Sequence, residues 1–456
     1  MNTHHPFHKL APALAIRGVH LDLKGTPPVF ERLLQLLDLF SALRFNLILM
    51  EWEDAFPWSI DSDFRSQTAY TEEEVRLFVE KAESLGLELV PLVQTLGHME
   101  NFLKAPGRIP LREIPECEDG INPLAEGASE LLQAMIQDVL RLMPGVKRFH
   151  LGGDEAWSFG QHPQARAFVE KHGAAELYLH HMNPLFDLLE KQNIRPMLWH
   201  DMMLHWDDDA LRRIAPRCDL VVWGYGEHPD ETRHHHASRH IIRLAEAGIP
   251  LWGATAFKGA DGRMGDRPML DRRRSSTEGW VEVAMRYHLT GLITTGWSRY
   301  NYNSAQCESI EASLDTLMTQ AILMYNGMIP EGVEGTAEDV LEHLWKSGEG
   351  KRFAAIRDAA DAYNKAHRNM RFEEFHHIWF GTRRQDRRLG PNPKFLVNYE
   401  KGLKQMEQTG HAYRKTLQSL IPEIWLDQYF QDRLEGFRYY LEKTFEQGGT
   451  TMPETH

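Results

Sequence analysis

The greater part of this chain alternates short apolar runs with stretches in which apolar residues recur at helical spacing. The runs are apolar throughout, which is typical of strands that are buried on both faces of a parallel sheet. We expect eight strands, at residues 14–23, 46–52, 87–95, 147–152, 195–200, 219–223, 250–257 and 291–297.

Eight strands that alternate with eight helices predict an α/β fold, namely a closed (β/α)8 barrel of the TIM type. An open doubly wound sheet usually has a glycine-rich phosphate loop after its first strand, and residues 22–28 do not fit that pattern. After about residue 330 the strand runs disappear, and apolar residues continue at helical spacing in charged surroundings. The predicted parts are an N-terminal tail (1–13), the barrel (14–329) and an all-helical C-terminal region packed on it (330–456).

The run from Arg148 to Trp157 reads Arg-Phe-His-Leu-Gly-Gly-Asp-Glu-Ala-Trp and ends the fourth expected strand. Neighbouring residues of a regular strand point to opposite faces, so Asp154 and Glu155 can reach one ligand only where the strand breaks. The two preceding glycines allow such a break. The alternative is a helix cap or a solvated loop. We favour a functional pair at the strand end.

Composition limits the classes of function. The 456 residues are 42% hydrophobic and can bury a large core, and the formal net charge of −14 argues against a nucleic-acid surface. The three cysteines lie far apart, so we expect neither a disulfide framework nor a zinc–thiolate site. No apolar signal region or membrane-spanning run is seen. We therefore expect a cytoplasmic protein with no nucleic-acid partner, no membrane contact, no metal and no other cofactor.

The motif His150-Leu-Gly-Gly-Asp154-Glu155 resembles the His-x-Gly-Gly-Asp-Glu signature of family 20 glycoside hydrolases, the β-N-acetylhexosaminidases. The resemblance covers about residues 14–326 and is nearest to the hexosaminidase D branch. It implies a retaining exo-hydrolase that acts on terminal β-linked GalNAc or GlcNAc. It also implies substrate-assisted catalysis, in which the acetamido group of the substrate is the nucleophile and an oxazolinium ion is the intermediate. Glu155 would then be the general acid and base, and Asp154 would orient the amide.

In such a barrel the carboxyl ends of all strands converge on one mouth. Three tryptophans near strand ends would form apolar walls, although each alone is as often a core residue. The resemblance implies that Arg17 binds sugar hydroxyls. We expect His98, with Glu53 or Asp54, to tune Glu155, and Tyr225 to contact the acetamido oxygen. The predicted substrate-binding residues are Arg17, Glu53, Asp54, His98, His150, Trp199, Trp223, Tyr225, Trp297, Arg299 and Tyr300.

The sequence departs from the family pattern at Trp297-Ser-Arg299, where many members have Trp-x-Glu. An arginine cannot accept hydrogen bonds, so the choice between GlcNAc and GalNAc stays open. The hexosaminidase D branch shares the Gly-Trp-x-Arg-Tyr pattern and is associated with a galactosaminide preference. The strand-seven Tyr-x-Asp of the secreted members is not found in Ala254-Thr-Ala-Phe257.

Two alternatives stay open. One is a metal-dependent barrel hydrolase that uses His98, His150, His200, Asp154 and Asp201, although the paired histidines usual in such sites are missing. The other is a carbohydrate-binding barrel without catalysis, which would not need both carboxylates. The helical C-terminal region also offers a surface for a homodimer.

Overall fold

The computed structural model describes residues 6–226, 228–230, 238–262, 264–330, 337–383 and 393–448 of the chain. Within that part, the side chains of residues 373–383, 393–396 and 444–448 are left out of the description.

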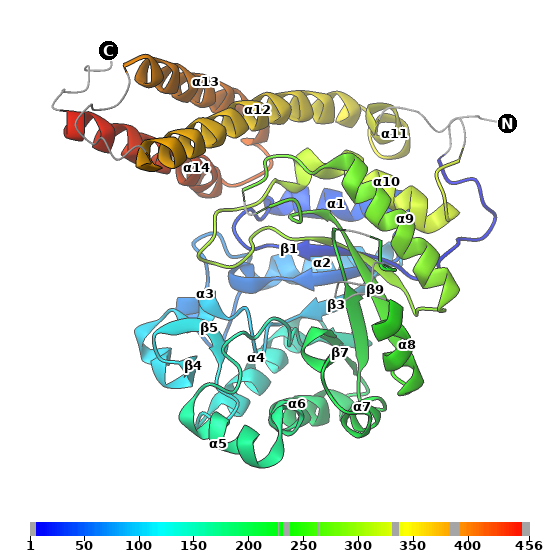
Figure 1. Cartoon of the computed structure of the whole chain (residues 1–456). Coiled ribbons are helices and arrows are strands. Elements are labelled where there is room, and N and C mark those ends of the chain that lie inside the picture. The colour runs from blue at the N-terminus through cyan, green and yellow to red at the C-terminus, as the bar shows by residue number, and fades with distance from the viewer. Residues whose placement is uncertain are drawn as a thin grey trace.

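Eight parallel strands close into a barrel in the order β1-β10-β9-β8-β7-β6-β3-β2 (Figure 1). All eight predicted strands are confirmed, and so is the (β/α)8 class. The ladder between β6 and β3 has the fewest residue pairs of the barrel, and in it Leu92 lies opposite His150. The strands are β1 (Arg17–Asp22), β2 (Leu47–Glu51), β3 (Glu88–Leu92), β6 (Arg148–His150), β7 (Arg195–Trp199), β8 (Asp219–Trp223), β9 (Leu251–Lys258) and β10 (Leu292–Gly296).

Helices surround the barrel and follow its strands along the chain. Thr71 and Glu74 form a reciprocal capping box that starts α2. These helices are α1 (Phe30–Ala42), α2 (Glu72–Ser84), α4 (Ala128–Leu142), α5 (Pro163–His172), α6 (Ala174–Glu190), α7 (Asp208–Ile214), α8 (Ser238–Glu246), α9 (Leu270–Arg286) and α10 (Leu314–Asn326).

Three features of the fold are not apparent from the sequence pattern. Apolar residues keep helical spacing over 164–191, but the helix is divided into α5 and α6 at Gly173, whose φ is +92°. The segment 97–122, which is rich in proline and glycine, contains α3 (Glu100–Leu103) and an antiparallel hairpin of β4 (Arg112–Ile114) and β5 (Cys117–Ile121). The helix α7, between β7 and β8, has only seven residues.

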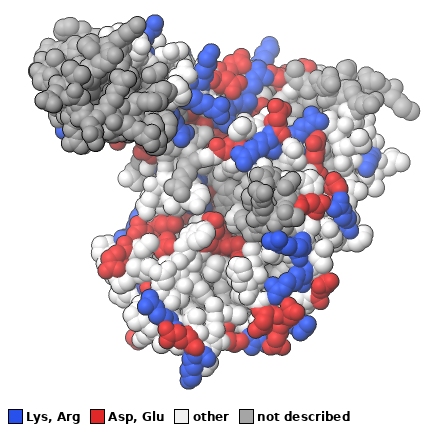
Figure 2. Space-filling model, viewed as in Figure 1, with Lys and Arg blue, Asp and Glu red and all other residues white. Residues whose placement is uncertain are grey.

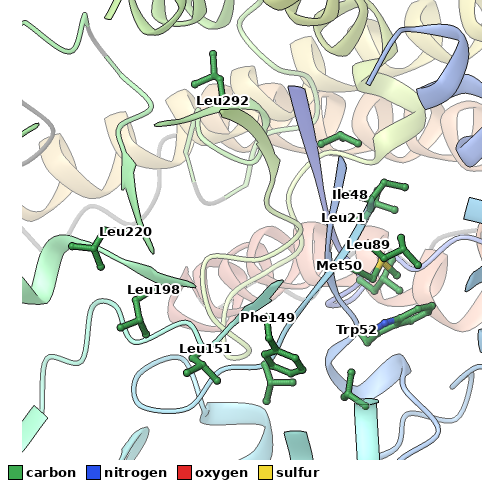
Figure 3. Close-up of a cluster of buried hydrophobic side chains, with 14 of the residues drawn as sticks. Leu21, Ile48, Met50, Trp52, Leu89, Phe149, Leu151, Leu198, Leu220 and Leu292 are labelled. Carbon is green, nitrogen blue, oxygen red and sulfur yellow. The ribbon is translucent and has the colours of Figure 1, made fainter. Parts of the chain in front are cut away.

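Buried apolar side chains fill two layers. Inside the barrel, ten residues of six strands, among them Trp199 and Trp252, form one cluster. The alternate residues of the same strands point outward, and Leu198, Leu220 and Leu292 belong to the cluster under the helices (Figure 3). The barrel is therefore a packed core and has room for a ligand only at its mouth.

The C-terminal region is helical, as predicted. It consists of α11 (Ala337–Leu344), α12 (Glu349–Arg383), α13 (Pro393–Leu417) and α14 (Glu423–Gly448), and the last three pack together above the barrel in Figure 1. Their shared cluster also takes in Ala312 of the barrel. Across the described residues, no helix combines the length and the apolarity needed to cross a bilayer.

Candidate active site

The strand β6 breaks immediately after His150, as the motif predicts. Gly152 and Gly153 have φ values of +64° and +82°, and a side chain at Gly152 would overlap the amide of Gln94. Only glycine fits there. The break turns the side chains of Asp154 and Glu155 into the same pocket.

Three non-glycine residues that follow the carboxyl ends of strands have left-handed backbone. The φ angles are +50° at Glu53, +56° at His98 and +41° at Glu155. Such a conformation costs roughly 1–3 kcal/mol and persists only where the surroundings enforce it. At Glu155 the backbone N–H donates to Oδ2 of Asp201 at 3.0 Å. The geometry of the motif is therefore held from the neighbouring strand β7.

His98 lies between the two motif carboxylates. Its Nε2 is 3.4 Å from Oδ2 of Asp154 and 3.4 Å from Oε2 of Glu155. Burial opposes the charge on the ring, but the two carboxylates and Glu100 outweigh it and hold the pKa of His98 well above its ordinary value. The imidazolium form therefore bridges both acids.

Asp201 completes this cluster from β7. Its Oδ1 accepts from Nε1 of Trp223 at 2.9 Å. Burial and the nearby charge of Asp154 raise the pKa of Asp201 to about 7. Oδ1 of Asp154 is buried without a hydrogen-bond partner within the protein. A buried acceptor of this kind is suited to a donor on a ligand.

The mouth holds a cavity of about 300 Å³. Trp223 and Tyr225 stack at 5.3 Å and 22° on one wall, and Trp297 meets Tyr225 edge-on at 6.4 Å. Figure 2 shows acidic side chains gathered in a band across α3 and β5. The cavity is lined by Lys24, Gln94, His98, Glu100, Asp154, Glu155, Trp223, Tyr225, Gly259, Ala260, Gly262, Trp297, Arg299, Tyr300, Asn301 and Cys307.

A buried network of charges supports the cavity from below. Glu51 accepts from Nζ of Lys24 at 2.7 Å and from Nε2 of Gln94 at 3.0 Å, and Nε2 of His20 lies 3.1 Å from its other oxygen. Burial opposes ionisation, but Lys24 and His20 lower the pKa of Glu51 far below its ordinary range. Lys24 is therefore fixed as a cation at the cavity wall.

Eight of the predicted site residues line this cavity: Asp154, Glu155, His98, Trp223, Tyr225, Trp297, Arg299 and Tyr300. They come from the ends of four different strands, β3, β6, β8 and β10.

The prediction for Arg17 is corrected by its position. Arg17 is the first residue of β1, so it lies at the end of the barrel opposite the mouth. Its guanidinium donates to the backbone carbonyls of Leu14 at 2.6 Å, Ala15 at 3.0 Å and Arg44 at 2.8 Å. Arg17 therefore binds backbone carbonyls at the end of the barrel that lies opposite the mouth.

Two further residues lie beneath the cavity. His150 and Trp199 are fully buried in the barrel and pack against each other at 4.4 Å. Trp199 also packs against Trp297 at 5.9 Å, and Nδ1 of His150 accepts from the N–H of Gly152 at 3.0 Å. Both side chains support the wall and the motif turn from inside the core, so contact with a ligand is not expected of them.

Glu53, which is half-buried, and Asp54, which is buried, follow β2 outside the cavity lining. Glu53 borders a separate void of about 20 Å³ and lies 4.0 Å from Nζ of Lys24. Burial and neighbouring carboxylates raise the pKa of Glu53 well above its ordinary value. Burial also raises the pKa of Asp54, against the positive charge of Arg299. Neither residue lines the cavity, and their contact with a ligand stays a prediction.

Several residues of the wall were not among the predicted site residues. Lys24 lies two residues beyond the end of β1, in a loop whose sequence is that of an ordinary turn. Glu100 lies two residues after His98 and is the first residue of the short helix α3. Gln94 was visible at a strand end, and that position was the signal for it. Asp201 also follows a strand end, but it binds the motif turn and does not line the cavity. Asn301 and Cys307 belong to the loop after β10, for which the sequence offers no periodic signal.

Within the described residues, one group of three side chains could converge on a metal ion. It consists of His228, Asp230 and Glu282, none of which lines the cavity. Arg286 already pairs with Asp230 at 2.7 Å. The five residues of the metal-dependent alternative do not form such a group.

Comparisons with known proteins agree with this geometry. The catalytic domain of glycosyl hydrolase family 20 matches residues 15–243. Hexosaminidase D of Bos taurus is 33% identical over 337 residues, which are 72% of this chain and 96% of the bovine protein. Hexosaminidase D of Homo sapiens is also 33% identical, over 72% of this chain and 69% of the human protein.

Solved structures share the fold. A chitobiase from Flavobacterium johnsoniae superposes with a TM-score of 0.57 at 15% identity, covering 97% of this chain and 74% of its own. A β-N-acetylhexosaminidase from Bacteroides fragilis NCTC 9343 gives 0.54 at 16% identity, covering 75% of this chain and 72% of its own.

The chain belongs to glycosyl hydrolase family 20. Within that family it is a β-N-acetylhexosaminidase, an enzyme that hydrolyses terminal β-N-acetylhexosaminides. This assignment replaces both remaining alternatives, the metal-dependent hydrolase and the non-catalytic binding protein.

Proposed function

We propose that the enzyme is a retaining exo-β-N-acetylhexosaminidase that cleaves terminal β-linked GalNAc or GlcNAc by substrate-assisted catalysis. The observation that supports it most is the cluster of His98, Asp154 and Glu155 at one wall of the cavity. An ordinary retaining glycosidase needs its nucleophile about 5–5.5 Å from its acid, usually on a different strand. Adjacent carboxylates fit a reaction in which the substrate provides the nucleophile.

In the first step, Glu155 gives its proton to the glycosidic oxygen as the bond from that oxygen to C1 breaks. The acetamido carbonyl oxygen attacks C1 from the opposite face and forms the oxazolinium ring. Asp154 accepts the amide N–H and stabilises the positive charge, a role for which its unpartnered Oδ1 is available. The imidazolium of His98 stabilises the carboxylate that Glu155 becomes.

In the second step, the Glu155 carboxylate takes a proton from water, and the hydroxide equivalent attacks C1. The ring opens and the acetamido group is regenerated. Two successive inversions at C1 give net retention. In this proposal Trp223, Tyr225 and Trp297 enclose the acetamido group, and Tyr225 donates to its oxygen.

The size of the cavity supports action on a single terminal sugar. Ligand pockets are usually about 300–1,000 Å³, and this cavity lies at the lower limit with about 300 Å³. Arg299 and Tyr300 line the part of the wall that follows β10, where they would face the outer hydroxyl groups. Arg299 only donates hydrogen bonds, so we propose that it selects at the 4-hydroxyl, by which GalNAc and GlcNAc differ.

We further propose a cytoplasmic location, because the three cysteines are free and two of them are buried. A homodimer is proposed through the helical C-terminal region, and size-exclusion chromatography with light scattering tests it.

The proposed activity is tested by hydrolysis of nitrophenyl β-N-acetylgalactosaminide and β-N-acetylglucosaminide, with EDTA present. We expect the wild type to cleave at least one of them. Glu155→Gln is then compared with the wild type on the methyl glycoside of the preferred sugar, whose poor leaving group needs the proton, and should lose roughly 10²–10⁴-fold in kcat. A requirement for added metal, or a Glu155→Gln enzyme as active as the wild type, would contradict the proposal.

A further inference from the structure

The C-terminal helices bind the barrel at the mouth. The N–H of Val29, in the loop after β1, donates to the carbonyl of Leu420 at 2.9 Å, and Nε1 of Trp425 donates to Thr68, in the loop after β2, at 2.6 Å. Tyr413 meets Ser309, beyond β10, at 3.2 Å. All of these loops follow the carboxyl ends of strands, so the helices sit on the side of the barrel that carries the chemistry.

The contact to the loop after β9 is a buried ionic cluster. Oδ1 of Asp266 accepts from Nε of Arg433 and from the hydroxyl of Tyr429, both at 2.7 Å, and Nδ1 of His367 lies 2.7 Å from Oδ2. The side chains of Asp266, His367 and Arg433 are almost fully buried. Burial raises the pKa of Asp266, but the charge of Arg433 and the hydrogen bond with His367 outweigh it and leave the pKa below its ordinary value. A cluster so buried fixes geometry, because a displaced partner would leave an unpaired charge.

The contact to the loop after β10 reaches a cavity residue directly. Oε1 of Gln428, on α14, accepts from Nη2 of Arg299 at 2.8 Å and lies 3.4 Å from Nε2 of Gln306. Arg433 donates to the carbonyl of Gln306 at 2.7 Å, and Gln306 pairs with Arg299 in an isolated β-bridge. Nη1 of Arg299 donates to the carbonyl of Tyr302 at 3.0 Å. One side chain of α14 therefore binds the guanidinium of Arg299, a residue that lines the cavity.

We propose that α14 is part of the substrate-binding apparatus, with Gln428 as the positioning residue that orients Arg299 toward the bound sugar. Gln428 acts through Arg299 and does not itself line the cavity. The inference rests on the proposed function, because it assumes that Arg299 contacts the terminal N-acetylhexosamine. It assigns to the C-terminal helices a role in sugar binding in addition to packing.

The first test is Gln428→Ala in the full-length enzyme. Gln428 is half-buried, so the helix should tolerate the change. Loss of a hydrogen bond to a charged group at a site remote from the reacting carbon should raise KM by roughly tenfold and change kcat by less than about twofold. Gln428→Glu keeps an acceptor oxygen for Arg299 and should restore KM. Gln431→Ala, an exposed glutamine of the same helix, is the matched control and should equal the wild type.

The second test is a double-mutant cycle with Arg299→Gln. If Gln428 acts through Arg299, Gln428→Ala adds nothing further to KM once Arg299 is replaced. If the effects of the two substitutions on KM instead add in the double variant, Gln428 does not act through Arg299. If Gln428→Ala leaves KM unchanged and only lowers the melting temperature, its role is purely structural. Either result overturns the proposal.

Calorimetric titration with free N-acetylgalactosamine and N-acetylglucosamine separates this inference from the proposed function. Gln428→Ala should bind the preferred sugar roughly tenfold more weakly than the wild type. If the wild type binds sugar but cleaves neither glycoside, the proposed reaction fails and the titration still decides the role of Gln428. If both proteins bind equally, the role of Gln428 is refuted.

Discussion

The backbone N–H of Glu155 donates a hydrogen bond of 3.0 Å to Oδ2 of Asp201. This bond joins the loop after β6 to the segment after β7 and holds Glu155 at a φ of +41°. We expect Asp201→Ala to release the strained turn and lower kcat/KM by roughly 10–100-fold, because small displacements of a catalytic group are costly. Asp209→Ala, at an exposed position of α7, is the control. Asp201→Ala with wild-type kcat/KM would show that the turn does not need this bond.

The position of His98 between two acids makes its contribution to stability depend on pH. Its pKa in the folded protein is raised by Asp154 and Glu155 in spite of burial. The contribution is therefore fully present below the ordinary histidine value of about 6.5 and is lost as the pH rises through the higher pKa of the folded state.

We accordingly expect the wild type to exceed His98→Gln in free energy of unfolding most at acidic pH, with the difference shrinking as the pH rises. Urea unfolding across the neutral and alkaline range measures it. His343→Gln, at an exposed position of α11, provides the comparison. A difference that stays constant with pH would argue against a charged His98.

The charge network below the cavity should be a main determinant of stability. Glu51 is 1% exposed and is bonded to Lys24, Gln94 and His20. Glu51→Gln leaves Lys24 without its closest counter-charge and should cost about 3–5 kcal/mol of unfolding free energy. Glu72→Gln removes a carboxylate from an exposed pair with Arg76 and should change stability little. Equal effects of the two changes in urea unfolding would contradict this account.

Selectivity between the two hexosamines should depend on Arg299. Replacement by glutamine introduces an acceptor where the wild type has only donors. We expect the ratio of kcat/KM for nitrophenyl β-GalNAc and β-GlcNAc to change by about tenfold or more, and Arg299→Lys, which keeps the charge, to change it less. An unaltered ratio in Arg299→Gln would place the choice of epimer elsewhere in the cavity.

Much of this molecule follows from local sequence patterns. The apolar runs predict all eight strands, and the strand end plus two glycines predicts the break that brings Asp154 and Glu155 into one pocket. The sequence patterns do not predict where along a strand a residue lies or to which side its side chain points. Arg17 was placed at the mouth although it begins β1, and Trp199 points into the closed core beneath the pocket. Such directions depend on barrel closure, which no local pattern contains.

Contacts between distant segments also escape sequence analysis. Gln428 lies 129 residues from Arg299 along the chain, and its role depends on how the C-terminal helices dock. In the sequence, Lys24 resembles an ordinary residue of a turn that contains glycine and proline. In the structure, its ammonium group donates a hydrogen bond to Glu51. Both are ordinary polar residues on their own segments, and only the tertiary contact distinguishes them.

The central claim, that the acetamido group of the substrate is the nucleophile and Asp154 serves it, is tested by substrates with successively fluorinated acetamido groups. Fluorine weakens the carbonyl oxygen as a nucleophile. The account predicts that kcat/KM of the wild type falls steeply with each added fluorine, and that Asp154→Asn is slower by roughly 10²–10³-fold on the parent substrate. Rates that do not depend on fluorination would contradict substrate assistance and would require a nucleophile from the protein.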